Sequence, residues 1–203
     1  MTTTSGTAVD LVERIQRCAP EFIDLITAED AGQWDSAIDS LLQMAVDHLE
    51  RNKKHLHSLG EDGLSAFVVA RLAVPGLHVS RETYSGGHVD ITIESLHSHH
   101  LLRSLGEAKI YDGYEYHKMG LEQLIDRYST GRECRGFVIE YIKKENATGL
   151  MAALRSEMDE KRPCRQQGQS RDHTIPWAFL SSHEHENGSN VDVGHLGCDL
   201  FVR

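Results

Sequence analysis

Residues 86–94 read Gly-Gly-His-Val-Asp-Ile-Thr-Ile-Glu, and residues 105–111 read Leu-Gly-Glu-Ala-Lys-Ile-Tyr. In the first run, apolar and polar side chains alternate from Val89 onwards, which is the period of a strand with one buried face. In the second run the same period places Glu107 and Lys109 on one face. We therefore predict an antiparallel hairpin that carries charged side chains on its polar face.

The register of this hairpin can be predicted from its pattern. It sets three pairs of residues opposite each other: Asp90 with Glu107, Glu94 with Arg103, and Ile91 with Gly106. Directly opposite residues have Cβ atoms roughly 4.5–5.5 Å apart, so the Asp90 and Glu107 carboxylates would meet. A slip of one residue would move them to opposite faces. The expected register is thus also the one that builds a site.

Two adjacent carboxylates repel each other, and a divalent cation relieves that repulsion. Oxygen ligands of this kind suit Mg²⁺ or Mn²⁺, which keep several waters and complete their shell with substrate phosphate. A lysine beside the metal would position the attacking water or stabilise the phosphate. Asp90, Glu107 and Lys109 are the residues expected to do this. The alternative is that all three are ordinary polar strand residues with a solvated lysine.

The pattern resembles the PD-(D/E)XK nuclease superfamily, which has the restriction-endonuclease-like fold. Asp90 followed by Glu107-Ala108-Lys109 stands where that family has its acidic residue and (D/E)-x-K, although Val89 replaces the proline. Glu61 matches an upstream acid that many members use as a further metal ligand. The resemblance covers about residues 60–142 and implies an αβββαβ core, with Asp90, Glu107 and Glu61 as metal ligands.

Further residues extend the resemblance downstream. Gln123 lies on the helix after the core strand, and Tyr128 follows five residues later, where the RecB-like branch has a spacing of four. Gln123 is therefore a candidate catalytic residue beside the carboxylates and Lys109, whereas Tyr128 continues an apolar stripe and is expected in the core. Glu61 has a second explanation, because Ser58-Leu-Gly-Glu61 also matches a helix capping box.

The resemblance implies a Mg²⁺-dependent endonuclease that acts on DNA in bacterial defence against phage or foreign DNA. It also implies a homodimer or a partner subunit. Two alternatives stay open: a catalytically inactive module of the same fold that binds nucleic acid or a partner, and a nuclease that acts on RNA or branched DNA.

Around this core we predict an α/β (α+β) protein in which a mixed sheet is flanked by helices, with an extra N-terminal helical segment. One domain, 1–203, would contain N-terminal helices (1–56), a catalytic core (57–145) and a C-terminal helix and strands (146–203). Beyond the hairpin, the expected helices are 9–18, 34–53, one opened by the capping box that starts at Ser58, and 149–160 capped by Thr148; the expected strands are 77–83, 136–142, 177–180 and one or two within 191–202.

Composition limits the functional classes. The formal net charge of −10 argues against a protein that coats nucleic acid through bulk positive charge. No apolar run is long enough to span a membrane, residues 1–7 do not resemble a secretory signal, and a cytoplasmic location is expected. The scattered cysteines predict free thiols rather than a zinc knuckle or disulfides: Cys18, Cys134, Cys164 and Cys198.

Arginine, lysine and histidine side chains outside the two hairpin strands form two groups of further candidate site residues. The first is the best candidate for a DNA-facing surface: Lys143, Lys144, Arg155, Lys161, Arg162, Arg165 and Arg171. The second consists of histidines near expected turns, for which solvated loops are the simpler explanation than metal binding: His97, His99, His100, His183 and His185. His88, two residues before Asp90, is a separate candidate that could reach the site or a phosphate.

Overall fold

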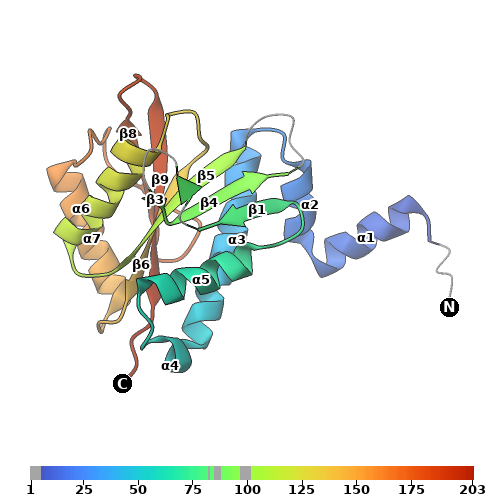
Figure 1. Cartoon of the computed structure of the whole chain (residues 1–203), viewed down its shortest axis with the longest axis horizontal. Coiled ribbons are helices and arrows are strands. Elements are labelled where there is room, and N and C mark those ends of the chain that lie inside the picture. Colours follow the sequence, from blue (N-terminus) through green and yellow to red (C-terminus); the bar gives the residue numbers. More distant parts are fainter. Residues whose placement is uncertain (1–5, 82, 85–87, 97–101) are drawn as a thin grey trace.

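The centre of the protein is a mixed seven-stranded sheet, seen in a computed structural model that describes residues 6–81, 83–84, 88–96 and 102–203 (Figure 1). Its strand order is β1 (Leu77–Ser80), β4 (Ile91–Ser95), β5 (Arg103–Ile110), β6 (Gly136–Ile142), β9 (Asn190–Asp199), β8 (Phe179–Glu184) and β7 (Arg171–Asp172). Strands β5, β6 and β9 are parallel neighbours, and the outer pairs on both sides are antiparallel. A separate two-stranded ribbon joins β2 (Thr83–Tyr84) to β3 (His88–Val89).

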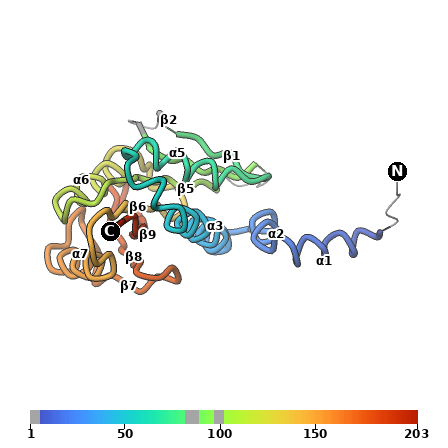
Figure 2. Tube along the Cα trace, turned by 90° about the horizontal axis from the view of Figure 1, so that it is seen from below, coloured from blue at the N-terminus to red at the C-terminus, as the bar shows by residue number. Residues whose placement is uncertain are grey.

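Helices cover both faces of this sheet (Figure 2). The helical elements are α1 (Ala8–Cys18), α2 (Pro20–Thr27), α3 (Ala31–Arg51), α4 (Lys53–Leu56), α5 (Glu61–Leu72), α6 (Tyr114–Glu122), the π-helix η1 (Gln123–Tyr128) and α7 (Ala147–Lys161). The apolar residues of α3 and α5 form one core with one face of the sheet, and those of α6, η1 and α7 form a second core with the other. The predicted class, an α+β protein with a mixed sheet flanked by helices, is confirmed.

The predicted hairpin register is also found. Strands β4 and β5 pair antiparallel with Ile91 opposite Gly106 and Glu94 opposite Arg103. Gly106 cannot carry a side chain, because a Cβ there would lie within 2.2 Å of the Phe137 ring on β6. From α5 to β6, with the short β2–β3 ribbon set aside, the elements follow the predicted order of helix, three strands, helix, strand.

Helix starts were the least accurate predictions. Gly60 is the N-cap of α5 and no side chain caps this helix, so the predicted capping box is wrong. Asn146, not Thr148, caps α7 by accepting a hydrogen bond from the Gly149 N–H at 3.2 Å. Pro20 does not merely end α1; it occupies the first turn of the unpredicted helix α2. Proline is favoured there because the first N–H groups of a helix have no intrahelical partner.

Several strand limits also differ from the predictions. Strand β1 ends at Ser80, earlier than predicted, and β8 runs over Phe179–Glu184 instead of 177–180. Residues 161–173, between the predicted helix over 149–160 and the predicted strand over 177–180, contain the end of α7 and the short strand β7.

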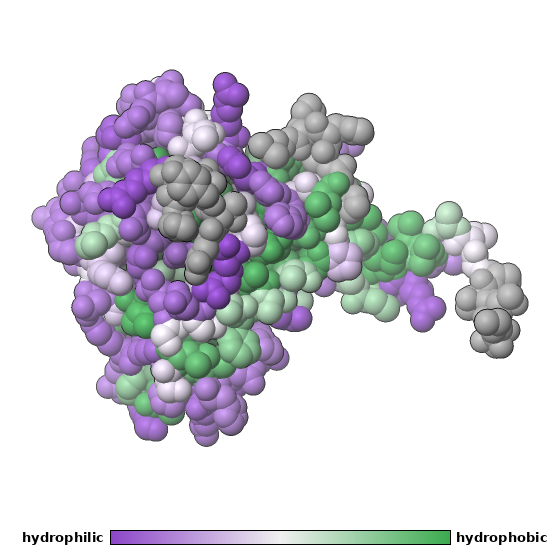
Figure 3. Space-filling view, viewed as in Figure 1, coloured by the Kyte–Doolittle hydropathy of each residue, from purple (hydrophilic) through white to green (hydrophobic). Residues whose placement is uncertain are grey.

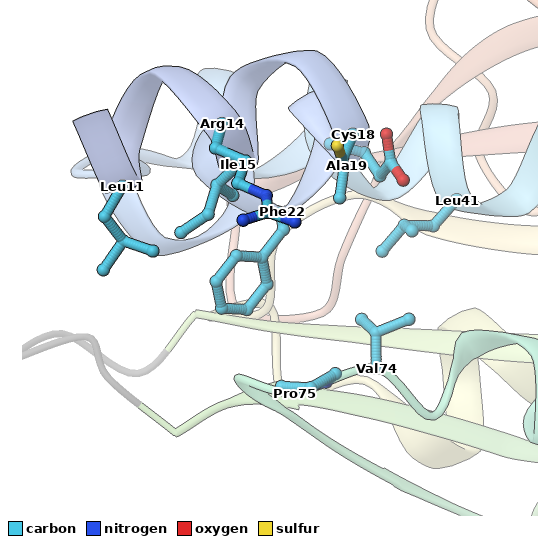
Figure 4. Close-up of a pocket in the computed structure, with 10 residues that line it drawn as sticks. Leu11, Arg14, Ile15, Cys18, Ala19, Phe22, Leu41, Val74 and Pro75 are labelled. Atoms are coloured by element: carbon cyan, nitrogen blue, oxygen red, sulfur yellow. The ribbon is translucent and has the colours of Figure 1, made fainter. Parts of the chain in front are cut away.

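The N-terminal helices extend from the body of the protein (Figures 1 and 2). No residue of α1 is buried, and Val9 and Leu11 are 64% and 60% exposed. Hydrophobic residues gather where these helices meet the body (Figure 3). There an apolar groove of about 650 Å³ lies between Leu11, Ile15 and Phe22 on one side and Val74 and Pro75 on the other (Figure 4). This groove is separate from the carboxylates of the central hairpin.

Candidate active site

Four of the predicted site residues meet at the β4–β5 hairpin. The Lys109 Nζ lies 2.5 Å from Glu107 Oε1, 3.5 Å from Glu61 Oε1 and 4.0 Å from Asp90 Oδ2. The two strands bring Asp90 and Glu107 together, and α5 adds Glu61 from its first turn. We call these four residues the carboxylate–lysine cluster.

Backbone N–H groups of β5 hold two of the carboxylates in place. The Ala108 N–H donates to Asp90 Oδ2 at 3.0 Å, and the Ile110 N–H donates to Glu61 Oε2 at 3.0 Å. Glu61 thus binds the strand that carries Lys109 and does not reach back to cap its own helix. Two roles were predicted for Glu61, a helix cap and a member of the site, and the structure favours the second.

Glu107 is the buried member of the cluster. Its side chain is 1% exposed, and its Oε2 has no hydrogen-bond partner among the described residues. Burial, together with the negative charge of Asp90, raises the pKa of Glu107 to about 7. Burial alone would lower the pKa of Lys109, but its hydrogen bond to Glu107 and the three nearby carboxylates raise it above the usual value. Lys109 therefore stays charged while Glu107 titrates near neutral pH.

Helix α6 packs directly on the cluster. A Cβ at Gly120 would lie 3.2 Å from Glu107 Cγ and 3.3 Å from both Cγ and Cε of Lys109. These distances are tighter than ordinary van der Waals contacts, so only glycine fits without displacing the two side chains. Sequence reasoning missed Gly120, because its role depends on a contact with a distant strand.

Gln123 and Tyr128 are the first and last residues of η1. Successive hydrogen bonds in a π-helix join residues five apart, so the wider turn brings these two residues to about one turn from each other. Tyr128 is buried in the apolar core, as predicted. Burial and the charges of Glu107 and Asp90 raise its pKa, which places its hydroxyl in the field of the cluster. The Gln123 Oε1 is buried without a hydrogen-bond partner among the described residues, and no hydrogen bond found there joins it to the cluster.

Two hollows adjoin the cluster. A small cavity of about 30 Å³ is lined by Glu61, Asp62, Ser65, Arg81 and Asp90. A wider, open hollow of about 750 Å³ shares Glu61 and Asp62 with it, and its other lining residues include two aromatic rings and two lysines: Tyr111, Tyr116, Lys143 and Lys144. The two tyrosines were not predicted as site residues.

The donor set of the cluster suits a hard cation, although the arrangement is not that of a preformed metal cage. Asp90, Glu107 and Glu61 supply only oxygen ligands, and Glu107 Oε2 is a buried oxygen without a partner. In the described part of the chain, no group of three or more His, Cys, Asp or Glu side chains is placed to hold a metal ion. Mg²⁺ needs only one or two carboxylates besides water and phosphate, so the pair Asp90 and Glu107 fits it.

Most residues of the predicted DNA-facing surface are held by acidic side chains. Their ion pairs are Lys144 with Asp112, Arg155 with Asp172, Lys161 with Glu157, Arg165 with Asp126, and Arg171 with Asp192. The Lys143 Nζ donates to the Leu59 carbonyl at 2.5 Å. Only Lys143 and Lys144 line the hollow beside Glu61.

The histidines divide into three groups. His183 is not on a solvated turn as predicted, because it is fully buried on β8. His185 follows that strand, and its Nε2 lies 3.2 Å from the Ser129 carbonyl oxygen. The other three histidines expected near turns, His97, His99 and His100, lie outside the described residues, as do residues 86–87 and the His88 side chain.

All four cysteines are free thiols, as the sequence predicts. No helix in the described ranges is long and apolar enough to cross a membrane. Comparisons of the chain with known protein families, with curated proteins and with solved structures found no match.

Proposed function

We propose that the protein is a metal-dependent nuclease that hydrolyses DNA phosphodiester bonds. The observation that supports this most is the convergence of Asp90, Glu107 and Glu61 on the ammonium of Lys109 within 4.0 Å, in the hairpin register predicted for such a site. Bringing three acids and a lysine together in a largely buried place beside an interior strand costs stability, which a structural role alone does not explain.

Asp90 and Glu107 would hold Mg²⁺ or Mn²⁺, with Glu61 as a further ligand. When bound, the ion supplies an activated water and stabilises charge on the phosphate. Lys109 then positions the water or the phosphate oxygen as a fixed positive charge next to the ligands. Glu107 must be ionised to bind a cation, and its raised pKa makes that ionisation depend on pH near 7. Gln123 would support the site from η1.

The wider hollow beside Glu61 is the proposed entry for the nucleic-acid backbone. Lys143 and Lys144 line it, although Lys144 is paired with Asp112, so a phosphate would have to compete with that carboxylate; the rings of Tyr111 and Tyr116 offer apolar surface. Phosphate contacts from lysines provide the sequence-independent part of DNA affinity. Because the sequence contains no recognisable base-reading motif, we propose that target choice lies with a partner subunit or a second copy, in a cytoplasmic system of defence against phage or foreign DNA.

One observation favours the alternative of a catalytically inactive module that binds nucleic acid or a partner. Lys109 already neutralises Glu107 at 2.5 Å, and the described residues form no cage of three or more metal ligands. In that case the cluster would be an internal ion-pair network, and DNA binding would not need a divalent ion.

A cleavage assay separates the two functions. Purified protein is incubated with supercoiled plasmid, linear duplex, single-stranded DNA, branched DNA and RNA, with Mg²⁺, with Mn²⁺ or with a chelator. The nuclease predicts metal-dependent cleavage that is lost in Glu107→Ala and Lys109→Ala. Matched controls are Glu160→Ala and Lys118→Ala, which change the same charges at sites away from the cluster.

Each outcome has one meaning for the proposed function. Equal cleavage by all five proteins would show that the cluster is not catalytic. Binding without cleavage, unchanged by chelator, would support the inactive module. Cleavage restricted to RNA or branched DNA would keep the mechanism and change the substrate. Light scattering on the same samples measures the mass and so tests the proposed homodimer.

A further inference from the structure

A second group of polar side chains is buried on the α6 side of the sheet, apart from the carboxylates of the cluster. It consists of a glutamate, three histidines and a serine, each 1% exposed or less: Glu140, His117, His195, Ser181 and His183. They come from β6, α6, β9 and β8, so the group links a helix to three neighbouring strands. Buried polar groups of this kind must satisfy one another.

The group forms one continuous hydrogen-bonded chain that ends on a backbone carbonyl. Its five links are Glu140 Oε1 to His117 Nδ1 at 2.7 Å, His117 Nε2 to His195 Nδ1 at 2.9 Å, His195 Nε2 to Ser181 Oγ at 2.6 Å, Ser181 Oγ to His183 Nε2 at 2.6 Å, and His183 Nδ1 to Cys164 O at 3.0 Å.

The carbonyl end fixes the direction of the last three links. The Cys164 carbonyl can only accept, so the His183 Nδ1 must carry a proton. The Nε2 of a neutral His183 then accepts from the Ser181 hydroxyl. That hydroxyl has only one proton, so the Ser181 Oγ must accept its other hydrogen bond from the His195 Nε2–H.

The directions of the two links nearest Glu140 follow in the same way. A neutral His195 protonated at Nε2 accepts at Nδ1, so the His117 Nε2 must carry the proton of that link. Five links need five protons, whereas three neutral histidines and one serine supply four. The fifth belongs to the link between Glu140 Oε1 and His117 Nδ1.

His183 and His195 do not hold this fifth proton. Burial lowers the pKa of His183 to about 4. Burial, followed by the neighbouring His117 ring, lowers the pKa of His195 well below its usual value. Both therefore stay neutral near pH 7, which is what the link directions require.

We propose that the fold binds one proton between Glu140 and His117 and thereby cancels the charge of Glu140 beside Lys109. Glu140 and Lys109 are paired in register on neighbouring parallel strands, which lie about 4.8 Å apart. An unprotonated Glu140 would be a fourth carboxylate near that ammonium. With the proton bound, Glu140 adds no negative charge, and the Lys109 ammonium interacts with the carboxylates of Glu107, Asp90 and Glu61.

Other titratable groups act on this hydrogen-bonded chain from neighbouring segments. Lys109 on β5 and Tyr111 directly after that strand lie near Glu140, and the charge of Glu140 contributes to the raised pKa of Tyr111 after burial. His173, in the segment after β7, acts on His195, and Asp192 on β9 acts on His183. Helix α7 presents apolar side chains to this face. The proposal does not depend on whether the protein cleaves DNA.

Nitrogen NMR of the histidine rings in the unmodified protein at pH 7 to 8 tests the link directions. The expected pattern is a proton on Nε2 of His117, on Nε2 of His195 and on Nδ1 of His183, with a strongly deshielded proton in the Glu140–His117 link. A His195 ring protonated at Nδ1 only, or a His183 ring protonated at Nε2 only, would overturn the proposal.

The net charge of the folded protein gives a second, independent test. In Glu140→Gln the amide can donate to His117 Nδ1, so the chain stays linked without the additional proton. We expect the native electrophoretic mobility at pH 8 to stay unchanged. The Glu140–His117 pair with its shared proton has no net charge, and neither has a glutamine beside a neutral His117. In urea, where unfolding releases the proton, the mobility should shift by one charge.

Glu160→Gln is the matched control, because Glu160 is exposed on α7. It should shift the mobility by one charge in both the folded and the unfolded protein. A native shift of one charge in Glu140→Gln as well would show that Glu140 is a bare carboxylate and would refute the bound proton. Should Glu140→Gln not fold, the NMR pattern of the unmodified protein still decides.

Discussion

Gly120 on α6 lies against Glu107 on β5 so closely that a Cβ at Gly120 would be 3.2 Å from the Glu107 Cγ. Gly120→Ala should therefore displace Glu107 and Lys109 while the helix itself gains about 1 kcal/mol in propensity. We expect the thermal midpoint to change little and DNA cleavage to fall about tenfold or more, because small misplacements of catalytic groups are costly. Cleavage rates and thermal melts measure the two effects separately. Unchanged cleavage in a folded variant would contradict the tight contact.

Glu107 should make the fold less stable at and above neutral pH than at about pH 4.5. Its pKa is about 7 in the folded protein against 4.5 for the free side chain, so the folded state holds more protons between these values. Stability then falls as pH rises from about 4.5 to about 7, by roughly 3 kcal/mol in all. Glu107→Gln removes this loss, and its urea midpoint should exceed that of the unmodified protein at pH 8 but not at pH 4.5.

A divalent ion provides the control for this pH effect. If Glu107 binds Mg²⁺, the ion should stabilise the unmodified protein at pH 8 and leave Glu107→Gln unchanged. A difference between the two proteins that is the same at both pH values would show that Glu107 does not titrate as described.

Gly106 on β5 should not tolerate replacement by a residue with a side chain. A Cβ there would lie within 2.2 Å of the Phe137 ring, which is itself buried between strands and helices. We expect Gly106→Ala to destabilise the protein by about 1–3 kcal/mol or more, because the ring must leave its place. Gly32→Ala, in the first turn of α3, is the matched control and should be neutral or stabilising. Urea unfolding of both variants makes the comparison.

Trp34 and Ser104 connect α3 to β5 through a buried hydrogen bond. The indole Nε1–H donates to the Ser104 Oγ at 2.8 Å, and both residues are 1% exposed or less. Ser104→Ala would leave the indole N–H buried without a partner, at a cost of about 1–3 kcal/mol. Ser36→Ala, exposed on the same helix, should change stability by less than about 0.5 kcal/mol. Fluorescence-detected unfolding would show whether the two variants differ.

The first helix should be dispensable for stability. Since no residue of α1 is buried, removing residues 1–18 should change the free energy of unfolding by less than about 1 kcal/mol. A longer truncation to residue 28 also removes the buried Leu25 of α2, and should cost several times more. Equal losses in both truncations would mean that α1 packs on the body in solution.

The hairpin could be predicted because its pairing follows from patterns within two short stretches of sequence. Alternation from Val89 to Glu94 fixes which side chains share a face, and a single register then satisfies both strands. The same reasoning placed Asp90, Glu107 and Lys109 together. The start of α2 was missed because Pro20 ends one helix and begins the next, and a proline in sequence signals either event.

The buried proton-binding chain could not have been predicted. His117 and His195 are 78 residues apart in sequence, and only the pairing of β6 with β9 beneath α6 brings them into contact. In the sequence, His183 lies in a polar run, Ser-Ser-His-Glu-His, close to a predicted turn, so the composition suggests a solvated side chain. Its burial depends on the segment around Cys164, which folds back over β8.

The wide turn of η1 bears on how distant relatives of this chain could be detected. A residue inserted into a helix normally rotates everything beyond it by about a third of a circle, and a pattern with fixed spacing then fails. In η1 the wider π-helical turn holds residues 123–128 within about one turn, so that Tyr128 lies in the field of the carboxylates although it follows Gln123 by five positions. Searches that allow the tyrosine to follow the glutamine by either four or five positions would accept both spacings, whereas a pattern with one fixed spacing would not.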